Sequence, residues 1–337
     1  MAGAHARQGG APPVLASPPF EAYLEPLRQQ AGIPGLSAVI LLHGEVVWER
    51  GFGFQNQETR LRAVPDTPYL VGDLSQTFAA VLLMQCVEGR RLELDAPVRR
   101  YGVNSTEPGV TLRQLLSHTS SGTFRYEPDR YAQLTELTTA CIPQPYRKSV
   151  SHRILEHLAM RDSVPGRDIL DTTAVPTGLY DPAHLERYQR VLERLAIPYR
   201  VDKRNKLTRT DLAVEGINAA TGLVSTARDL ARFDRALDTT LLLEETRLLS
   251  WTNTPIADVN GAPTGLGWFV QNYRGERIVW HYGLIPNAYS SLYLKVPSRG
   301  LTVILLANSD GLSAPFQLHL GDVTRSVFAS LFLRLFL

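Results

Sequence analysis

Short runs of β-branched, aromatic and alternating apolar residues lie at both ends of the chain. Residues 36–54 contain two such runs on either side of His43 and Gly44, and a break of this kind predicts a β-hairpin. From residue 266 onwards the segments GWFVQNY, ERIVWHYG, SSLYLKVP and LTVILLANS form four more runs with turn residues between them. A meander of this kind is typical of antiparallel strands. We therefore expect one antiparallel sheet that is built from both ends of the chain.

The middle of the chain shows the apolar period of helices instead. Helices are predicted over about 73–89, 129–141, 149–159, 183–196 and 226–238, with a short one in TLRQLLSHTSSG and a last one from about 315. The span 161–215 is rich in proline and charge, which indicates mainly loop around its one helix.

This order of elements predicts an α+β fold, in which the sheet is flanked by helices and an all-helical domain is inserted into the chain. We expect a flexible N-terminal segment over 1–22. The sheet domain would comprise 23–72 and 260–337, and the mainly helical domain 73–259, with a cleft between the two.

Composition narrows the classes of partner. With 44% hydrophobic and 20% charged residues the chain is typical of a globular protein, and its net charge of +2 gives no bulk attraction to nucleic acid. No apolar run is long enough for a transmembrane helix, since Arg334 interrupts the last one, SVFASLFLRLFL. The N-terminus as written lacks the apolar core of a signal peptide, so no export is expected from it.

The two cysteines lie far apart in sequence. Cys86 falls within an apolar helix pattern, and we expect it to be an inert buried thiol. The spacing between Cys86 and Cys141 neither establishes nor excludes a disulfide.

The start of the helix near residue 73 carries an unusual pair. In VGDLSQTF, Asp73 and Gln76 stand three residues apart, which places their side chains on one helical face. Aspartate is a favoured N-cap residue, and glutamine at the third helical position is its partner in a capping box. The pair is therefore either a capping box or the altered remains of a catalytic pair.

Six blocks of sequence resemble those of a known superfamily, in the same order. They are IPGLSAVILLHGEVVWERGFGF, DTPYLVGDLSQTFAA, LELDAPVRRYG, TLRQLLSHTSSG, GLVSTARDLARF and HYGLIPNAYSSLYLKVPSRGLTVILLANSDG. The chain resembles the serine β-lactamase and penicillin-binding-protein superfamily, in its class C β-lactamase, esterase and D-alanyl-D-alanine peptidase branch. The likeness covers roughly residues 25–312. It implies an antiparallel sheet flanked by helices, an all-helical second domain and a cleft between them.

The chemistry of that superfamily requires a serine nucleophile and a lysine base three residues later. The resemblance places Asp73 at the serine position and Gln76 at the lysine position. Ser75 is no substitute, because Phe78 follows it at the lysine spacing and it lies about 200° around the helix from residue 73. No Ser-x-x-Lys occurs at any of the four lysines, which are Lys148, Lys203, Lys206 and Lys295.

A second superfamily element is a Tyr-x-Asn signature in a loop of the helical domain. The match is FRYEPDRY, which supplies Tyr126 and places Pro128 where the asparagine would be. That proline removes an amide that can both donate and accept hydrogen bonds. Tyr126 is either a retained catalytic tyrosine or an aromatic residue that packs at the N-terminus of a helix.

The third superfamily element, on an edge strand, matches His281-Tyr282-Gly283. The resemblance implies that His281 faces the cleft, although a lone histidine in a strand is usually structural. Gly283 would let a ligand backbone approach the strand, and the N–H group of Leu284 would form the strand's half of the oxyanion hole. We interpret His118, in the turn HTSSG, as part of the scaffold.

Three functional hypotheses remain open. The chain either has lost acyl-enzyme chemistry and keeps a ligand site, or is a hydrolase in which Tyr126, His281 or Asp73 activates water, or is a non-catalytic interaction protein. The expected ligand is a small molecule or peptide that carries an acyl or amide group. We expect no cofactor and no metal, since His152 and His157 lack the spacing of a helical zinc pair.

Overall fold

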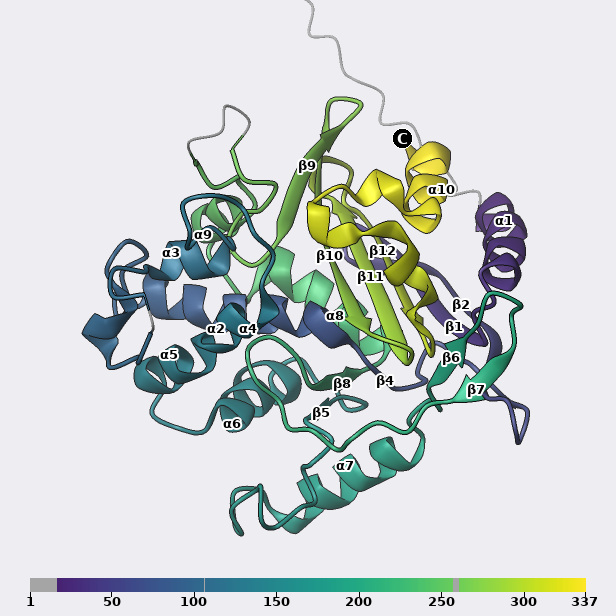
Figure 1. Ribbon diagram of the computed structural model, residues 1–337, viewed down its shortest axis with the longest axis horizontal. Helices are drawn as coiled ribbons and strands as arrows, with labels where there is room; N and C mark the ends of the chain where they lie inside the picture. Colours follow the sequence, from purple (N-terminus) through teal and green to yellow (C-terminus); the bar gives the residue numbers. More distant parts are fainter. Residues whose placement is uncertain (1–16, 106, 257–260) are drawn as a thin grey trace, which may run out of the picture.

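The strands at the two ends of the chain form one antiparallel sheet. The computed structural model describes residues 17–105, 107–256 and 261–337, and its seven-stranded sheet has the order β3-β2-β1-β12-β11-β10-β9 (Figure 1). The strands are β1 (Gly35–Leu42), β2 (Glu45–Asn56), β3 (Leu61–Arg62), β9 (Phe269–Tyr273), β10 (Glu276–Ile285), β11 (Tyr289–Val296) and β12 (Leu301–Ala307). Strand β1 pairs with β12 from Leu36 opposite Ala307 to Leu42 opposite Leu301. The prediction of one sheet from both ends is confirmed.

The turn between β1 and β2 explains the N-terminal hairpin. His43 has a φ of 51° and Gly44 a φ of 79°. Two consecutive residues with positive φ are what a two-residue type I′ hairpin turn requires, and its twist matches that of the strands on either side. The predicted hairpin around His43 and Gly44 is confirmed.

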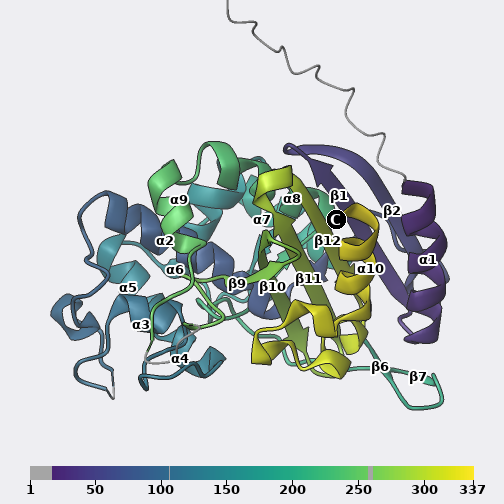
Figure 2. The ribbon, with the colours of Figure 1, turned by 90° about the horizontal axis from the view of Figure 1, so that it is seen from above.

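The helices divide between the two faces of the sheet. Helices α1 (Ser17–Gln30) and α10 (Val327–Phe336) lie side by side over one face, and the other helices lie mostly beyond the opposite face (Figure 2). These others are α2 (Ser75–Glu88), α3 (Leu112–Leu116), α4 (Pro128–Ala132), α5 (Leu134–Cys141), α6 (Tyr146–Val150), α7 (Pro182–Glu193), α8 (Ala227–Thr239) and α9 (Glu244–Ser250). This mixture of helices with an antiparallel sheet is an α+β fold, as predicted.

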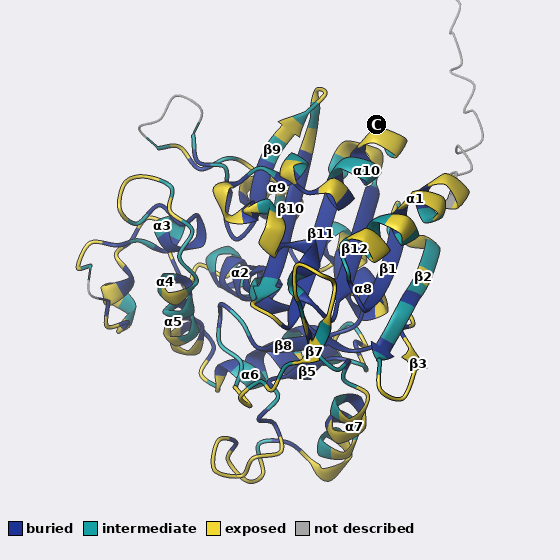
Figure 3. Cartoon of the chain, turned by 45° about the vertical axis from the view of Figure 1, so that its right-hand side comes forward, coloured by how far each residue is buried: buried dark blue, intermediate teal, exposed yellow. Residues whose placement is uncertain are grey.

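Burial on both faces accounts for the apolar runs of the central strands. Every residue of β11 and β12 is buried, and Figure 3 shows the central strands dark blue beneath the exposed outer surfaces of the helices. One core contains Phe20 of α1, Phe332 of α10 and alternate residues of the strands, and the other contains α2, α5, α8 and the opposite strand residues. In the second core the Phe78 ring stacks on Phe233 with a centroid distance of 4.1 Å, so α2 is fixed against α8.

Several element boundaries differ from the sequence prediction. A 3₁₀ turn at Gly72–Leu74 precedes α2, and the helix expected over 149–159 consists of α6 followed by a π-helical segment at Ser151–Glu156. The helix expected from about 315 begins only at Val327, because four short 3₁₀ turns come first.

The span expected to be mainly loop contains short paired strands besides α7. These are β5 (Val164–Pro165), which joins β4 (Tyr69–Leu70) and β8 (Leu223–Ser225) in a small sheet, and the pair β6 (Tyr199–Val201) and β7 (Leu207–Arg209).

The ends of the chain were also subjects of prediction. Most of the flexible segment expected over 1–22 lies outside the described residues, and 17–22 form the first part of α1.

The division into two domains stays a prediction. In the part of the chain that the structure describes, no helix has the length and apolar character that crossing a membrane requires.

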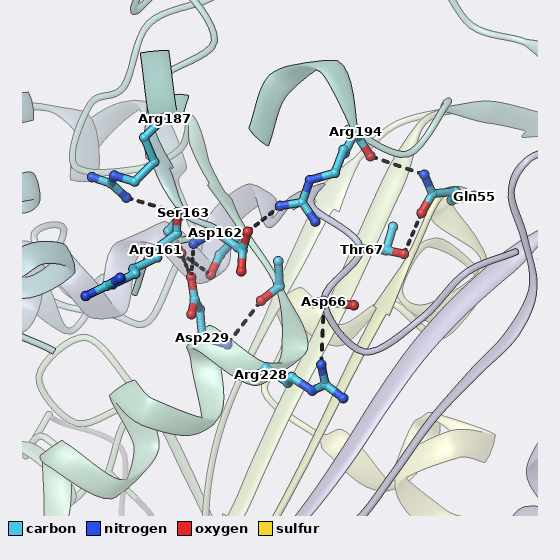
Figure 4. A network of polar contacts seen from close by, with 12 residues as sticks. Gln55, Asp66, Thr67, Arg161, Asp162, Ser163, Arg187, Arg194, Arg228 and Asp229 are labelled. Carbon is cyan, nitrogen blue, oxygen red and sulfur yellow. Dashed lines mark hydrogen bonds and ion pairs between the residues drawn. The ribbon is translucent and has the colours of Figure 1, made fainter. Parts of the chain in front are cut away.

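A buried polar network attaches α7 to the rest of the molecule. Asp229, at the start of α8, accepts hydrogen bonds from the Asp162 N–H group at 2.8 Å and the Ser163 hydroxyl at 2.9 Å. Asp162 pairs in turn with Arg194, the residue that ends α7 (Figure 4). The turn at 162–163 thereby connects α7 with α8, which packs on the sheet.

The two cysteines form a disulfide. Cys86 of α2 is bonded to Cys141 at the end of α5. The expectation that Cys86 is an inert thiol is therefore wrong: the tertiary fold packs α2 against α5, which brings together two cysteines separated by 55 residues.

Candidate ligand site around Asp73

The backbone before α2 places Asp73 beside the edge of β10. Gly72 has a φ of 59°, a region that favours glycine, and a Cβ atom there would lie 2.8 Å from the Leu284 nitrogen. The backbone N–H groups of Leu284 and of Asp73 itself lie close enough to the Asp73 carboxyl to act on its pKa. The side chain is partly exposed. Two converging backbone donors thus meet one acidic group at this point.

Asp73 and Gln76 do not form the capping box that the sequence suggested. The N-cap of α2 is Leu74, which has no side-chain cap, because a 3₁₀ turn leads directly into the helix. The Gln76 amide is bonded elsewhere, and the capping-box prediction for this pair is wrong. The structure has a capping box at Thr111 and Gln114, at the start of α3.

Gln76 connects a histidine to a tyrosine. Its Nε2 donates to the Tyr126 hydroxyl at 3.1 Å, and its Oε1 lies 3.0 Å from His118 Nε2. The Gln76 side chain is fully buried. The Tyr131 hydroxyl also donates to the Gln76 carbonyl oxygen at 3.0 Å, which fixes the first turn of α2.

The direction of these hydrogen bonds follows from the backbone around His118. The Glu127 N–H group donates to His118 Nδ1 at 3.2 Å, so in the neutral imidazole Nε2 must carry the proton. His118 therefore donates to Gln76 Oε1, and the Gln76 amide nitrogen must point to Tyr126. Since the Tyr126 oxygen accepts from Gln76, its own proton is free to be donated toward Asp73 or Tyr282.

Aromatic rings surround this chain of hydrogen bonds. The Tyr126 ring centroid lies 4.5 Å from that of His118, 5.5 Å from that of Phe269, 5.6 Å from that of Tyr282 and 6.5 Å from that of His281. Tyr126 thus contacts Gln76 and lies near His281, and the Asp73 charge acts on it. The prediction that these four residues line one cleft stays a prediction. A hollow of about 600 Å³ between β2 and α8 is lined by other residues.

Burial keeps most of these groups neutral. It lowers the pKa of His118 to about 3 and the pKa of His281 to about 4. Burial, together with the nearby Asp73 charge, raises the pKa of Tyr126 well above its usual value. Burial also raises the pKa of Asp73 to about 7, while the backbone donors act in the opposite direction.

We expect Asp73→Asn to stabilise the protein at pH 8 but not at pH 4. Because the folded pKa of Asp73 is raised from 3.8 to about 7, folding takes up a proton between these values, and wild-type stability falls as the pH rises through that window. The Asp73→Asn variant should gain about 2 kcal/mol of unfolding free energy at pH 8. This is less than the full pKa shift corresponds to, because the Asp73 side chain is partly exposed to solvent. Urea unfolding at both pH values measures the gain, and an equal gain at pH 4 would exclude titration as its cause.

The structure gives Gly283 and Ser75 structural roles. A Cβ atom on Gly283 would lie 1.8 Å from the Val71 carbonyl oxygen, so the chain's own backbone, and not a ligand as expected, occupies the space beside this glycine. Ser75 is buried, where its hydroxyl donates to the Gly72 carbonyl at 2.7 Å and accepts from the Leu223 N–H group at 3.3 Å. Both partners of its hydroxyl are therefore backbone groups.

The sequence analysis did not identify His118 and Tyr282 as residues of this site. His118, interpreted as scaffold, determines the orientation of Gln76, and Tyr282 interacts with Tyr126 through its hydroxyl. The position of His118 before the polar run TSSG gave only a weak signal, and in the structure this residue has a φ of 55°. Tyr282 gave no signal beyond its place between His281 and Gly283.

Comparisons with known proteins agree with this architecture. The beta-lactamase family model matches residues 20–320. The human mitochondrial serine beta-lactamase-like protein LACTB is 31% identical over 113 residues, which are 32% of this chain. The match spans only 20% of the length of that protein.

Two solved structures share the fold. An octameric penicillin-binding protein homologue from Pyrococcus abyssi superimposes with a TM-score of 0.75 at 22% identity, over 95% of this chain and 78% of that one. The D-amino acid amidase from Ochrobactrum anthropi SV3, complexed with L-phenylalanine amide, gives 0.70 at 20% identity, over 94% of this chain and 97% of that one. Since the family model matches most of its length, the chain belongs to the beta-lactamase family.

Proposed function

We propose that this protein binds a ligand beside Asp73 without forming an acyl-enzyme. In this proposal Asp73 occupies the position of the serine nucleophile and Gln76 that of the lysine base. The observation that carries the proposal is the hydrogen-bonded chain from His118 through Gln76 to Tyr126, which occupies both polar groups of the Gln76 amide.

The two side chains are unsuited to acyl transfer. A carboxylate that attacked an acyl carbon would give a reactive mixed anhydride instead of a stable ester. The Gln76 amide cannot accept a proton near neutral pH. The two hydroxyl groups in the first turn of α2 are bonded to the backbone: Ser75 donates to the Gly72 carbonyl and accepts from the Leu223 N–H group, and Thr77 donates to the Leu74 carbonyl.

Two features support a retained ligand site. The Asp73 carboxyl lies beside the backbone N–H groups of Leu284 and of Asp73 itself, which makes this a polar point next to the aromatic rings of Tyr126 and Tyr282. Asp73, Tyr126 and Leu284 are partly exposed, so a ligand can reach them. The amidase that shares the fold was solved with an amino acid amide, which agrees with a ligand of this class.

Turnover of nitrocefin tests the proposal. We expect the wild-type protein to hydrolyse nitrocefin no faster than the Asp73→Ala variant, since neither has a nucleophile at this position. Hydrolysis above that control, at a rate that depends on Asp73, would contradict the proposal.

The raised pKa of Asp73 favours a second candidate, a hydrolase without a covalent intermediate. A carboxylate with a pKa of about 7 can take a proton from water near neutral pH. The water oxygen would form the new bond to the acyl carbon while the acyl C–O or C–N bond breaks, and protonated Asp73 would give the proton to the departing alcohol or amine.

An ester assay tests this second candidate. If Asp73 acts as the base, hydrolysis of p-nitrophenyl acetate should rise with pH through about 7 and be abolished in Asp73→Asn. Equal rates in the wild-type protein and the variant would exclude it.

A further inference from the structure

The groups around Asp73 carry one negative charge and no positive one. His281 and Tyr282 come from β10, His118 from the turn after α3, Gln76 from α2 and Tyr126 from the segment before α4. Burial lowers the pKa of both histidines far below neutral and raises that of both tyrosines, so all four are uncharged near pH 7. Gln76 is neutral at any pH.

The charged side chains that flank Tyr126 form ion pairs. On the segment before α4, Glu127 pairs with Arg125 at 3.1 Å and with Arg130 at 2.9 Å. Arg130 also pairs with Glu107 at 2.7 Å. Among the residues that the structure describes, Asp73 itself forms no ion pair. The ionised Asp73 carboxylate is therefore left without a cationic partner.

The accessible part of the site matches a compact cation. Asp73 and Tyr126 are both partly exposed, and the Tyr126 hydroxyl lies 3.1 Å from Nε2 of Gln76, which stands three residues after Asp73. Tyrosine rings and hydroxyl oxygens attract an ammonium group, and a carboxylate attracts it more strongly. A ligand carboxylate would meet Asp73 without any compensating cation.

From this arrangement, and resting on the proposed function, we infer that the site binds a ligand through an ammonium group, which pairs with Asp73 and lies against Tyr126. The site thus selects cationic amines and rejects carboxylates.

A matched series of ligands tests the inference by isothermal titration calorimetry at pH 8. The series is 2-phenylethylamine, which is protonated there, neutral 2-phenylethanol and the anion 3-phenylpropanoate. We expect the ammonium compound to bind at least about tenfold more tightly than the alcohol, and the carboxylate to bind most weakly. Affinity for the ammonium compound should fall about tenfold from pH 8 to pH 6, as Asp73 becomes protonated.

Two variants supply the controls. Asp73→Asn should remove both the charge preference and the pH dependence, whereas Asp129→Asn, which changes an exposed acid on α4, should leave both intact. Absence of binding by the ammonium compound, or equal or tighter binding of the carboxylate, would overturn the inference. Neither result bears on acyl-enzyme formation, so the proposed function stands or fails separately.

Discussion

The variant that carries both Asp73→Ser and Gln76→Lys is expected to be labelled by a fluorescent penicillin, whereas the wild-type protein stays unlabelled. The two changes restore a hydroxyl and an amine one turn apart on the same face of α2. Removing the carboxylate also frees the N–H groups of Leu284 and residue 73 for an oxyanion. One such donor is typically worth about 2.7–4 kcal/mol in the transition state.

His118 favours this recovery of reactivity. Its Nε2–H group points at position 76, where it would face the lysine nitrogen. A donor there disfavours the ammonium form and leaves the lone pair of the amine available as a base. Turnover should remain slow, because Pro128 still stands where the superfamily has an asparagine.

The single variants are the matched controls for this experiment. Asp73→Ser alone lacks a base, and Gln76→Lys alone lacks a nucleophile, so neither should be labelled beyond the wild-type background. A correctly folded double variant that reacts no faster than the singles would show that this region no longer supports acylation, and would favour the interaction-protein hypothesis.

Removing the disulfide is expected to cost about 4 kcal/mol of unfolding free energy. Cys86 and Cys141 close a loop of 55 residues, and a cross-link over such a loop reduces the entropy of the unfolded chain by a comparable amount. Both cysteines are buried in the core that holds α2, the helix that begins just after Asp73. Urea unfolding of the Cys86→Ala/Cys141→Ala variant measures the loss.

Reduction provides an independent check on the disulfide. A thiol reductant should lower the stability of the wild-type protein toward that of the double variant, and should leave the variant unchanged. Alkylation of both cysteines in the folded, unreduced protein would show that the bond does not form.

The fold could be predicted from the sequence because its signals are local. Period-two runs specified the strands, and the His43-Gly44 pair specified the first hairpin. The order of the six blocks then supplied the topology, which no single run contains. The boundaries that failed, such as the late start of α10 at Val327, lie in stretches where apolar residues continue through several 3₁₀ turns.

The site was only partly predictable, because its contacts cross long stretches of sequence. Asp73, Gln76 and Tyr126 were identified by resemblance, and the structure brings them together, although their catalytic assignment stays a prediction. His118 acts on Gln76 from 42 residues away, and no periodicity reports such a contact. The capping box failed for the same reason: Gln76 has tertiary partners that compete with the helix end.

Intact-mass spectrometry of the wild-type protein after incubation with excess benzylpenicillin tests the central claim most directly. With Asp73 and Gln76 in place of a serine and a lysine, we predict an unchanged mass, with the Asp73→Ser/Gln76→Lys variant as the positive control that gains one penicilloyl group. A stoichiometric adduct on the wild-type protein, mapped by peptide sequencing to a residue beside Asp73, would contradict the account.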